Sequence, residues 1–108
     1  MAPSADEFCV ALSTCPDQDT AGKLARILVE EGVVACATIV PGARSIYRWR
    51  GAVHEDDEVL LVMKTRASRF AELAAAIAAR HPYETPEIVA LPLVAAGAPY
   101  LDWLAATL

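Results

Sequence analysis

Residues 33–65 constrain the fold more than any other part of the chain. They read VVACATIVPGARSIYRWRGAVHEDDEVLLVMKT, and two extended runs flank a turn at Gly51. Val33–Val40 holds β-branched and small apolar residues without charge, which predicts a strand covered on both faces. After a break at Pro41-Gly42, the alternation from Ser45 to Arg50 predicts a second extended run. The pattern indicates a β-hairpin whose limbs are about twice the usual strand length of about 5–6 residues.

The tip of so long a hairpin needs another surface, because a ribbon of two strands is unstable in water. Tyr47 and Trp49 lie near this tip. We expect them to pack against a second copy of the protein, since aromatic side chains anchor interfaces, although they could instead form a platform for a ligand. The chain is also 56% hydrophobic over 108 residues, more than one small core can bury. These features predict an obligate homo-oligomer.

Five further segments have the patterns of regular elements. They are a buried strand at Phe8–Thr14, a helix capped by Asp17 or Asp19 and closed by Gly32, a helix capped by Thr65 and ending near His81, a core strand at an edge over Glu87–Leu93, and a short helix opened by Gly97 and Pro99. With the hairpin, this order predicts an α+β, ferredoxin-like βαββαβ sandwich with an extra C-terminal helix. We expect a single domain over residues 1–108, with residues 1–7 as a flexible N-terminus. One face of the sheet would remain uncovered within one chain.

Charge, cysteine count and missing motifs argue against several classes of function. A net charge of −5 argues against a nucleic-acid partner, which would need a basic patch. No apolar run approaches the roughly 18–20 residues of a membrane span, so no membrane partner is expected. The three cysteines have no zinc spacing and no leader sequence is evident, which predicts reduced thiols in a cytoplasmic protein. Without a phosphate-binding loop, a nucleophile elbow or a metalloprotease motif, no enzyme class is supported.

Several segments resemble the CutA family of divalent-cation tolerance proteins. They are Ala35-Cys36-Ala37, Ile39–Gly42, Ser45–Trp49, Lys64-Thr65, the block HPYETPEI at His81–Ile88, and Tyr100-Leu101-x-Trp103. The likeness runs from about Val10 to the end of the chain. It implies a homotrimer of ferredoxin-like subunits, with hairpins packed around a three-fold axis and clefts between subunits. It also implies a role in tolerance of copper and other divalent cations, and an architecture similar to that of PII signalling proteins.

The chain departs from that family at the copper positions. Copper binding there is associated with a Cys at the end of the first strand and with histidines just before the Pro-Tyr pair. Here these positions hold Ser13, and Arg80 followed by His81. Cys15 would share a face with Ser13 if the strand extended that far, which Pro16 makes doubtful, and Cys15 is the thiol we expect to be most reachable. His81 is therefore the one predicted metal ligand, for Cu²⁺ or another divalent cation, and no cofactor is expected to be obligatory.

Five residues are predicted to line a ligand cleft, and each has a structural alternative. Neutral imidazole binds copper or zinc, but His81 could instead cap its helix. Tyr83 and Glu84 follow in a rigid turn, where they either complete a site with His81 or hold the last strand in register. Cys36 is either a buried core thiol or a soft ligand for Cu(I). Lys64 ends a hydrophobic strand, where it either pairs with Glu84 or Glu58 in the cleft or is solvated.

Together these features predict a homotrimeric, non-enzymatic divalent-cation tolerance protein that binds a copper-like metal ion or a small ligand in inter-subunit clefts. The alternative is a PII-like signalling scaffold without a metal role, which acts through a protein partner. An acid–base enzyme that uses His81 and Glu84 is a third hypothesis. Ion binding would weaken at low pH as His81 becomes protonated, whereas a scaffold would co-purify with its partner.

Overall fold

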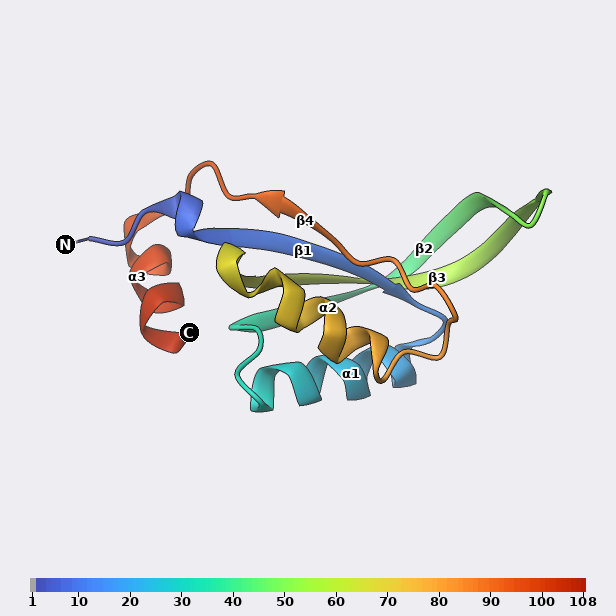
Figure 1. Cartoon of the computed structure of the whole chain (residues 1–108), viewed down its shortest axis with the longest axis horizontal. Helices are drawn as coiled ribbons and strands as arrows, with labels where there is room; N and C mark the ends of the chain where they lie inside the picture. Colours follow the sequence, from blue (N-terminus) through green and yellow to red (C-terminus); the bar gives the residue numbers. More distant parts are fainter. Residues whose placement is uncertain (1) are drawn as a thin grey trace.

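The computed structural model describes residues 2–108, which form one four-stranded antiparallel sheet with two helices on one face and the C-terminal helix at one end (Figure 1). The elements are the 3₁₀ turn η1 (Ala5–Glu7), β1 (Phe8–Cys15), α1 (Gln18–Glu30), β2 (Cys36–Trp49), β3 (Ala52–Arg66), the 3₁₀ turn η2 (Ala67–Arg69), α2 (Phe70–Ala78), β4 (Val89–Pro92) and α3 (Ala98–Thr107). The strand order is β2-β3-β1-β4. The predicted α+β, ferredoxin-like βαββαβ order with an extra C-terminal helix is confirmed.

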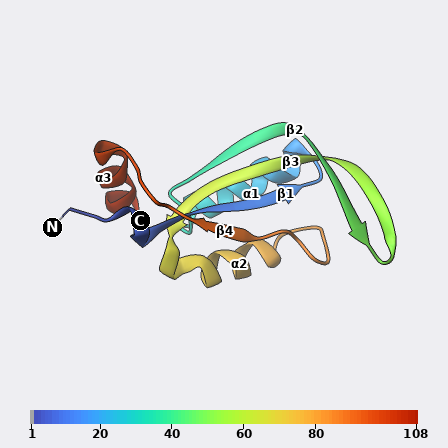
Figure 2. The same ribbon diagram turned by 90° about the horizontal axis from the view of Figure 1, so that it is seen from above.

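The long hairpin is formed by β2 and β3, whose pairing continues to Trp49 opposite Ala52. Between them Arg50 and Gly51 have φ of 50° and 79°, and a two-residue turn with two positive φ angles matches the twist of the strands. The hairpin extends beyond α1 and α2, at the opposite end of the molecule from α3 (Figures 1 and 2), and the molecule measures 51 × 25 × 24 Å. The predicted central hairpin is therefore confirmed.

Pro41 and Gly42 form a bulge and do not end the strand. Val40 pairs with Leu60 and Ala43 pairs with Glu58, so two residues of β2 lie opposite one residue of β3. Gly42 has a φ of 82°, which favours glycine at this position. The predicted break at this dipeptide is wrong, because the extra residue bends the strand while the pairing resumes beyond it.

The main core lies between the sheet and helices α1 and α2. It is built from buried residues on the helix-facing side of β1 and β3 and on one stripe of each helix: Ala11, Cys15, Val59, Leu61, Met63, Leu24, Leu28, Leu73 and Ile77. Asp17 begins α1 by accepting a hydrogen bond from the Thr20 N–H over 2.7 Å, as predicted. Gly32 follows the helix with a φ of 71°, the left-handed conformation expected after a helix end.

Both edge strands are more exposed than the sequence predicts. β2 begins at Cys36, and Ile39 and Val40 are 37% and 40% exposed, so the prediction of a strand covered on both faces is wrong for one chain. β4 is confirmed as an edge strand, but it covers only Val89–Pro92 and all four residues are exposed, so the prediction of a core strand is wrong. Both errors have one cause, because apolar composition does not reveal how much of an edge strand a single chain leaves exposed.

Thr65 lies inside β3 and does not cap α2. Its pairing with Cys9 continues the β1–β3 ladder, and its buried hydroxyl donates to the Val33 carbonyl over 2.7 Å. The 3₁₀ turn η2 separates it from the helix, and α2 has no side-chain cap. The predicted cap is therefore wrong, because the hydroxyl satisfies a carbonyl of the loop that leads into β2.

Part of the N-terminal segment forms the 3₁₀ turn η1. The Ser4 N–H donates to Glu7 Oε2 over 2.7 Å at the 3₁₀ turn η1. Met1 lies outside the described residues, and the flexibility of residues 1–7 stays a prediction. No helix in residues 2–108 is long and apolar enough to cross a membrane.

The sheet face opposite α1 and α2, which we call the open face, is uncovered in one chain except at the end where α3 contacts Cys36 and Lys64. Cross-strand partners share a face, so the register places the following residues there: Val10, Leu12, Thr14, Cys36, Thr38, Val40, Leu60, Val62, Lys64, Val89 and Leu91. Val10, Leu12, Leu60 and Val62 are half-buried, although they belong to the two central strands. A largely apolar sheet surface is therefore exposed along the molecule.

Candidate functional site

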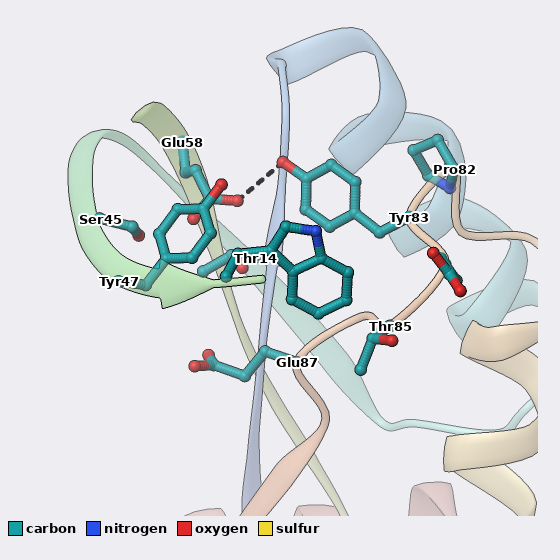
Figure 3. A pocket seen from close by; sticks show the side chains of 10 residues that line it. Thr14, Ser45, Tyr47, Glu58, Pro82, Tyr83, Thr85 and Glu87 are labelled. Atoms are coloured by element: carbon teal, nitrogen blue, oxygen red, sulfur yellow. Dashed lines mark hydrogen bonds between the residues drawn. The ribbon is translucent and has the colours of Figure 1, made fainter. Parts of the chain in front are cut away.

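A cavity of about 480 Å³ lies where the hairpin faces the loop between α2 and β4 (Figure 3). Its lining residues come from β1 (Thr14), from the hairpin (Ser45, Tyr47, Trp49, Glu58) and from the loop (Pro82, Tyr83, Glu84, Thr85, Glu87). Three of them are aromatic and three are glutamates, and the lining holds no lysine, arginine, histidine or cysteine. The size falls within the range of about 300–1,000 Å³ that is usual for small-molecule sites.

Glu58 and Tyr83 form the deepest polar pair of this cavity. Glu58 is 8% exposed, and its Oε2 accepts a hydrogen bond from the Tyr83 hydroxyl over 2.8 Å. Burial raises the pKa of Tyr83 well above its usual value, and the hydrogen bond to Glu58 and the charge of that carboxylate raise it further. The phenol therefore stays neutral at physiological pH and remains a donor to Glu58.

His81 orients the loop that carries Tyr83. The Tyr83 N–H donates to His81 Nδ1 over 3.1 Å, so this nitrogen carries no proton. His81 Nε2 lies 2.7 Å from the Thr14 carbonyl oxygen, which can only accept, so Nε2 holds the proton and donates it. The two bonds select one neutral tautomer and join the loop to the end of β1. The His81 N–H also donates to the Ile77 carbonyl over 2.8 Å and so closes α2 through the backbone.

One chain does not provide a transition-metal site around His81. A metal binds the lone pair of a neutral imidazole, and here Nδ1 uses its lone pair for a backbone N–H while Nε2 carries a proton. Residues 2–108 contain no group of three histidine, cysteine, aspartate or glutamate side chains placed to hold a metal ion. The geometry of the single chain thus favours the structural alternative for His81, and its role as a metal ligand stays a prediction for an assembly of chains.

Tyr47 and Trp49, the predicted interface residues, both line the cavity. Tyr47 donates a hydrogen bond to Asp56, which raises the pKa of Tyr47, and its ring stacks on His54 with 5.6 Å between centroids. The Arg50 guanidinium lies 5.3 Å from the centroid of a Trp49 ring. The same guanidinium donates to Glu84 Oε2 over 2.9 Å, which joins the hairpin tip to the loop.

Cys36 and Lys64 lie at the other end of the sheet. They are paired neighbours in β2 and β3, and both contact Tyr100 of α3. Cys36 Sγ is 3.5 Å from the Tyr100 hydroxyl, and Lys64 Nζ is 5.8 Å from the Tyr100 ring centroid. Burial raises the pKa of Tyr100 to about 12, and the contact with Cys36 adds to this.

The five predicted cleft residues therefore fall into two groups within one chain. His81, Tyr83 and Glu84 lie on the loop near Glu58. Lys64, which pairs with Cys36, lies six residues beyond Glu58 along β3. At about 3.3 Å per residue, the two groups are about 20 Å apart. The single chain brings together Tyr83 and Glu84 with Tyr47 and Trp49, but not with Cys36 or Lys64.

Two expectations about the end of β1 are wrong. The strand extends to Cys15, so Ser13 and Cys15 do share a face, because pairing with Val59 and Leu61 holds the strand up to Pro16. Cys15 is fully buried and not the reachable thiol, with Sγ 3.8 Å from His81 Nε2. Burial raises the pKa of Cys15 to about 11, with contributions from nearby carboxylates.

Sequence reasoning considered Glu58 only as an ion-pair partner of Lys64, and it missed Arg50 as a site residue. Glu58 ends the charged run HEDDE, which is typical of a solvated segment, but it is buried where it contacts Tyr83 of the loop, 25 positions away in the chain. Arg50 is a turn residue whose partner is 34 positions away. Neither contact has a local sequence signal.

Comparisons with known proteins agree with this fold. The family model described as CutA1 divalent ion tolerance protein matches residues 9–107. The chain is 50% identical over 95 residues to the divalent-cation tolerance protein CutA of Thermus thermophilus, covering 88% of this chain and 92% of that protein. It is 43% identical over 94 residues to the CutA homolog of Xenopus laevis, covering 87% of this chain but 62% of that longer protein.

A solved structure from Archaeoglobus fulgidus, described as a periplasmic divalent cation tolerance protein CutA, has a TM-score of 0.89 at 32% identity, over 93% of this chain and 97% of that one. Because that structure is described as periplasmic, the cytoplasmic location of this protein stays a prediction. Matches in sequence and in structure both extend over most of the chain, and the protein belongs to the CutA1 family of divalent ion tolerance proteins.

Proposed function

We propose that the protein is a non-enzymatic homotrimer that binds a divalent cation, such as Cu²⁺, or a small ligand in clefts between its subunits, in the divalent-cation tolerance role of its family. The observation that carries this proposal is the separation of the predicted cleft residues. Cys36 and Lys64 lie about 20 Å from the group around Tyr83 and Glu84 along a rigid sheet. They can share one site only if an end of one copy lies against the other end of its neighbour.

The open face supports an assembly of copies. Its central residues are apolar and only half-buried, and at the hairpin Tyr47 and Trp49 are 41% and 38% exposed. Monomeric proteins rarely expose contiguous apolar surface on this scale. Charge supports the same arrangement, since Lys64 has no ion-pair partner within residues 2–108.

A bound metal ion would need ligands from more than one chain. The imidazole nitrogens of His81 are both engaged in one chain, so an ion would have to displace the Tyr83 N–H or the Thr14 carbonyl. The small-ligand alternative needs no such displacement, because the cavity beside Tyr83 already has the size of a ligand site.

The test combines light scattering, which gives the mass of the assembly, with calorimetric titration of Cu(II). The variant His81→Ala is compared with His54→Ala, the second histidine of the chain, which lies on the hairpin. A trimer that binds the ion saturably, with binding lost only in His81→Ala, supports the metal proposal. Weak heat that is equal in all three proteins removes the metal role, and a monomer overturns the inter-subunit cleft.

A PII-like scaffold is the second candidate function. The hairpin surface that faces away from Tyr47 exposes Ile46 by 67% and Val53 by 64%, and such apolar side chains on a projecting ribbon are suited to a protein partner. Affinity purification of wild type against Ile46→Glu is the test. The scaffold predicts one partner that is captured in stoichiometric amount by wild type and lost in the variant.

A further inference from the structure

The cavity contains a buried negative charge without a positive partner. Glu58 is 8% exposed, and its one hydrogen-bond donor within residues 2–108 is the neutral Tyr83 hydroxyl. None of the ion pairs among these residues includes Glu58. Burying a carboxylate is costly unless a cation accompanies it. A cation in the cavity would remove this cost.

The shape and the lining of the cavity indicate what kind of cation fits. A volume of about 480 Å³ is much larger than a bare metal ion, and no group of three metal-binding side chains is found among residues 2–108. The walls near Glu58 are instead the rings of Tyr47, Trp49 and Tyr83. In the view of Figure 3, the Glu58 carboxylate lies between the Tyr47 and Tyr83 rings. Aromatic faces attract ammonium groups and exclude water from them.

The chain already uses this chemistry at the hairpin tip. The Arg50 guanidinium lies 5.3 Å from a Trp49 ring centroid and donates to Glu84 over 2.9 Å. An organic cation is thus held there by one aromatic ring and one carboxylate of the cavity lining. Deeper in the cavity, Glu58 offers a more buried carboxylate between two further rings. Anionic ligands such as nucleotides do not fit, because the lining carries three glutamates and no basic residue.

We propose that this cavity binds a small organic ammonium ion, with its charged head beside Glu58 and its carbon substituents against Tyr47, Trp49 and Tyr83. This inference rests on the small-ligand part of the proposed function and names its ligand class. Glu58 supplies the charge, and the rings supply selectivity for an alkylated cation over a hydrated metal ion. The hydrogen bond that the Tyr83 N–H donates to His81 Nδ1 fixes the loop that carries the third ring.

Choline is a suitable probe, because 3,3-dimethylbutan-1-ol has the same shape without the charge. The full-length protein is titrated with each compound, and binding is followed by the shift of the Trp49 indole N–H signal in NMR spectra. We expect saturable choline binding and no saturation with the neutral alcohol. Glu58→Gln should weaken choline binding by about tenfold or more, because the buried charge is lost while a hydrogen-bond acceptor for Tyr83 remains.

Glu55→Gln is the matched control, since it removes the same charge from the same strand on the opposite face. It should change choline affinity by less than about twofold, because its carboxylate is solvated. If Glu58→Gln does not fold, Trp49→Leu provides the test, with the same expected loss of choline affinity. Its binding is measured by isothermal titration calorimetry, which does not need the Trp49 signal. Equal binding of the neutral alcohol, or equal weakening by Glu55→Gln, would overturn the proposal.

Two further outcomes separate this inference from the function on which it rests. Saturable Cu(II) binding without choline binding would overturn the ammonium site and leave the divalent-ion function standing. If wild type does not bind choline but Lys64→Gln does, a lysine from a neighbouring copy fills the cavity, and the proposal is overturned. Choline binding without ion binding would support the ammonium site and remove the metal role.

Discussion

Removing the Tyr83 hydroxyl tests the central contact of the cavity. Tyr83→Phe keeps the ring but leaves Glu58 Oε2 without its donor at 2.8 Å. Hydrogen bonds to buried charged groups contribute about 2 kcal/mol, so the free energy of unfolding should fall by about this amount. Tyr47→Phe is the matched control, because Tyr47 donates to the exposed Asp56, and it should cost about 0.5 kcal/mol or less.

A double-mutant cycle isolates the contact from other effects of the substitution. In a Glu58→Gln background the acceptor is neutral, so Tyr83→Phe should cost only about 1 kcal/mol, leaving a coupling energy of about 1 kcal/mol. The assay is guanidinium unfolding followed by circular dichroism at one fixed protein concentration, because assembly makes stability concentration-dependent. A coupling near zero, or equal losses for Tyr83→Phe and Tyr47→Phe, would refute the reasoning.

The pH dependence gives a second reading of the same contact. The pKa of Tyr83 is higher in the folded chain than its unfolded value of about 10, so the folded state holds this proton more tightly. The resulting stability is fully present below about pH 10 and is lost as the pH rises above it. The stability difference between wild type and Tyr83→Phe should therefore shrink above pH 10. A difference that stays constant into strong alkali would contradict the raised pKa.

Three other predictions follow from single buried contacts. Cys15 should resist a thiol reagent at pH 8 in the folded protein and react after unfolding, because it is fully buried and its pKa is raised to about 11; modification before unfolding, detected by mass spectrometry, would contradict this. Thr65→Val should lower the free energy of unfolding by about 1–2 kcal/mol through loss of the bond to the Val33 carbonyl, whereas Thr65→Ser should recover most of it. Leu61→Ala should cost about 3 kcal/mol because Leu61 is fully buried, against less than about 0.5 kcal/mol for Val94→Ala, which is 89% exposed; equal costs in chemical unfolding would contradict the core assignment.

Much of the fold could be predicted because its signals are local. Asp17 caps α1 through a neighbouring N–H, Gly51 turns the hairpin by its own positive φ, and Pro92 marks an edge strand by its missing donor. The prediction failed where a residue had two local interpretations. Thr65 fits a helix cap as well as a strand end, and only its pairing with Cys9 decides between them.

The candidate site was predicted less completely. Tyr83 and Glu84 were identified through the block that contains His81, and they do line the cavity with Tyr47. Glu58 was assigned to a solvated charge run, because its burial depends on the contact with Tyr83, 25 positions away in the chain. The bulge opposite Val59 shifts Tyr47 and Trp49 of β2 to the face that holds Glu58. The pairing register across a bulge cannot be counted from the sequence of one strand.

The sequence by itself determined the order of the elements, the long hairpin and the family, since these depend on periodicity, turn residues and short motifs within a few positions of each other. The tertiary structure alone decided which tautomer His81 adopts, that Cys15 is buried, and that the predicted cleft residues divide into two groups about 20 Å apart. These properties depend on distances between residues far apart in the chain. Strand register and helix packing set such distances, and no local pattern of amino acids encodes them.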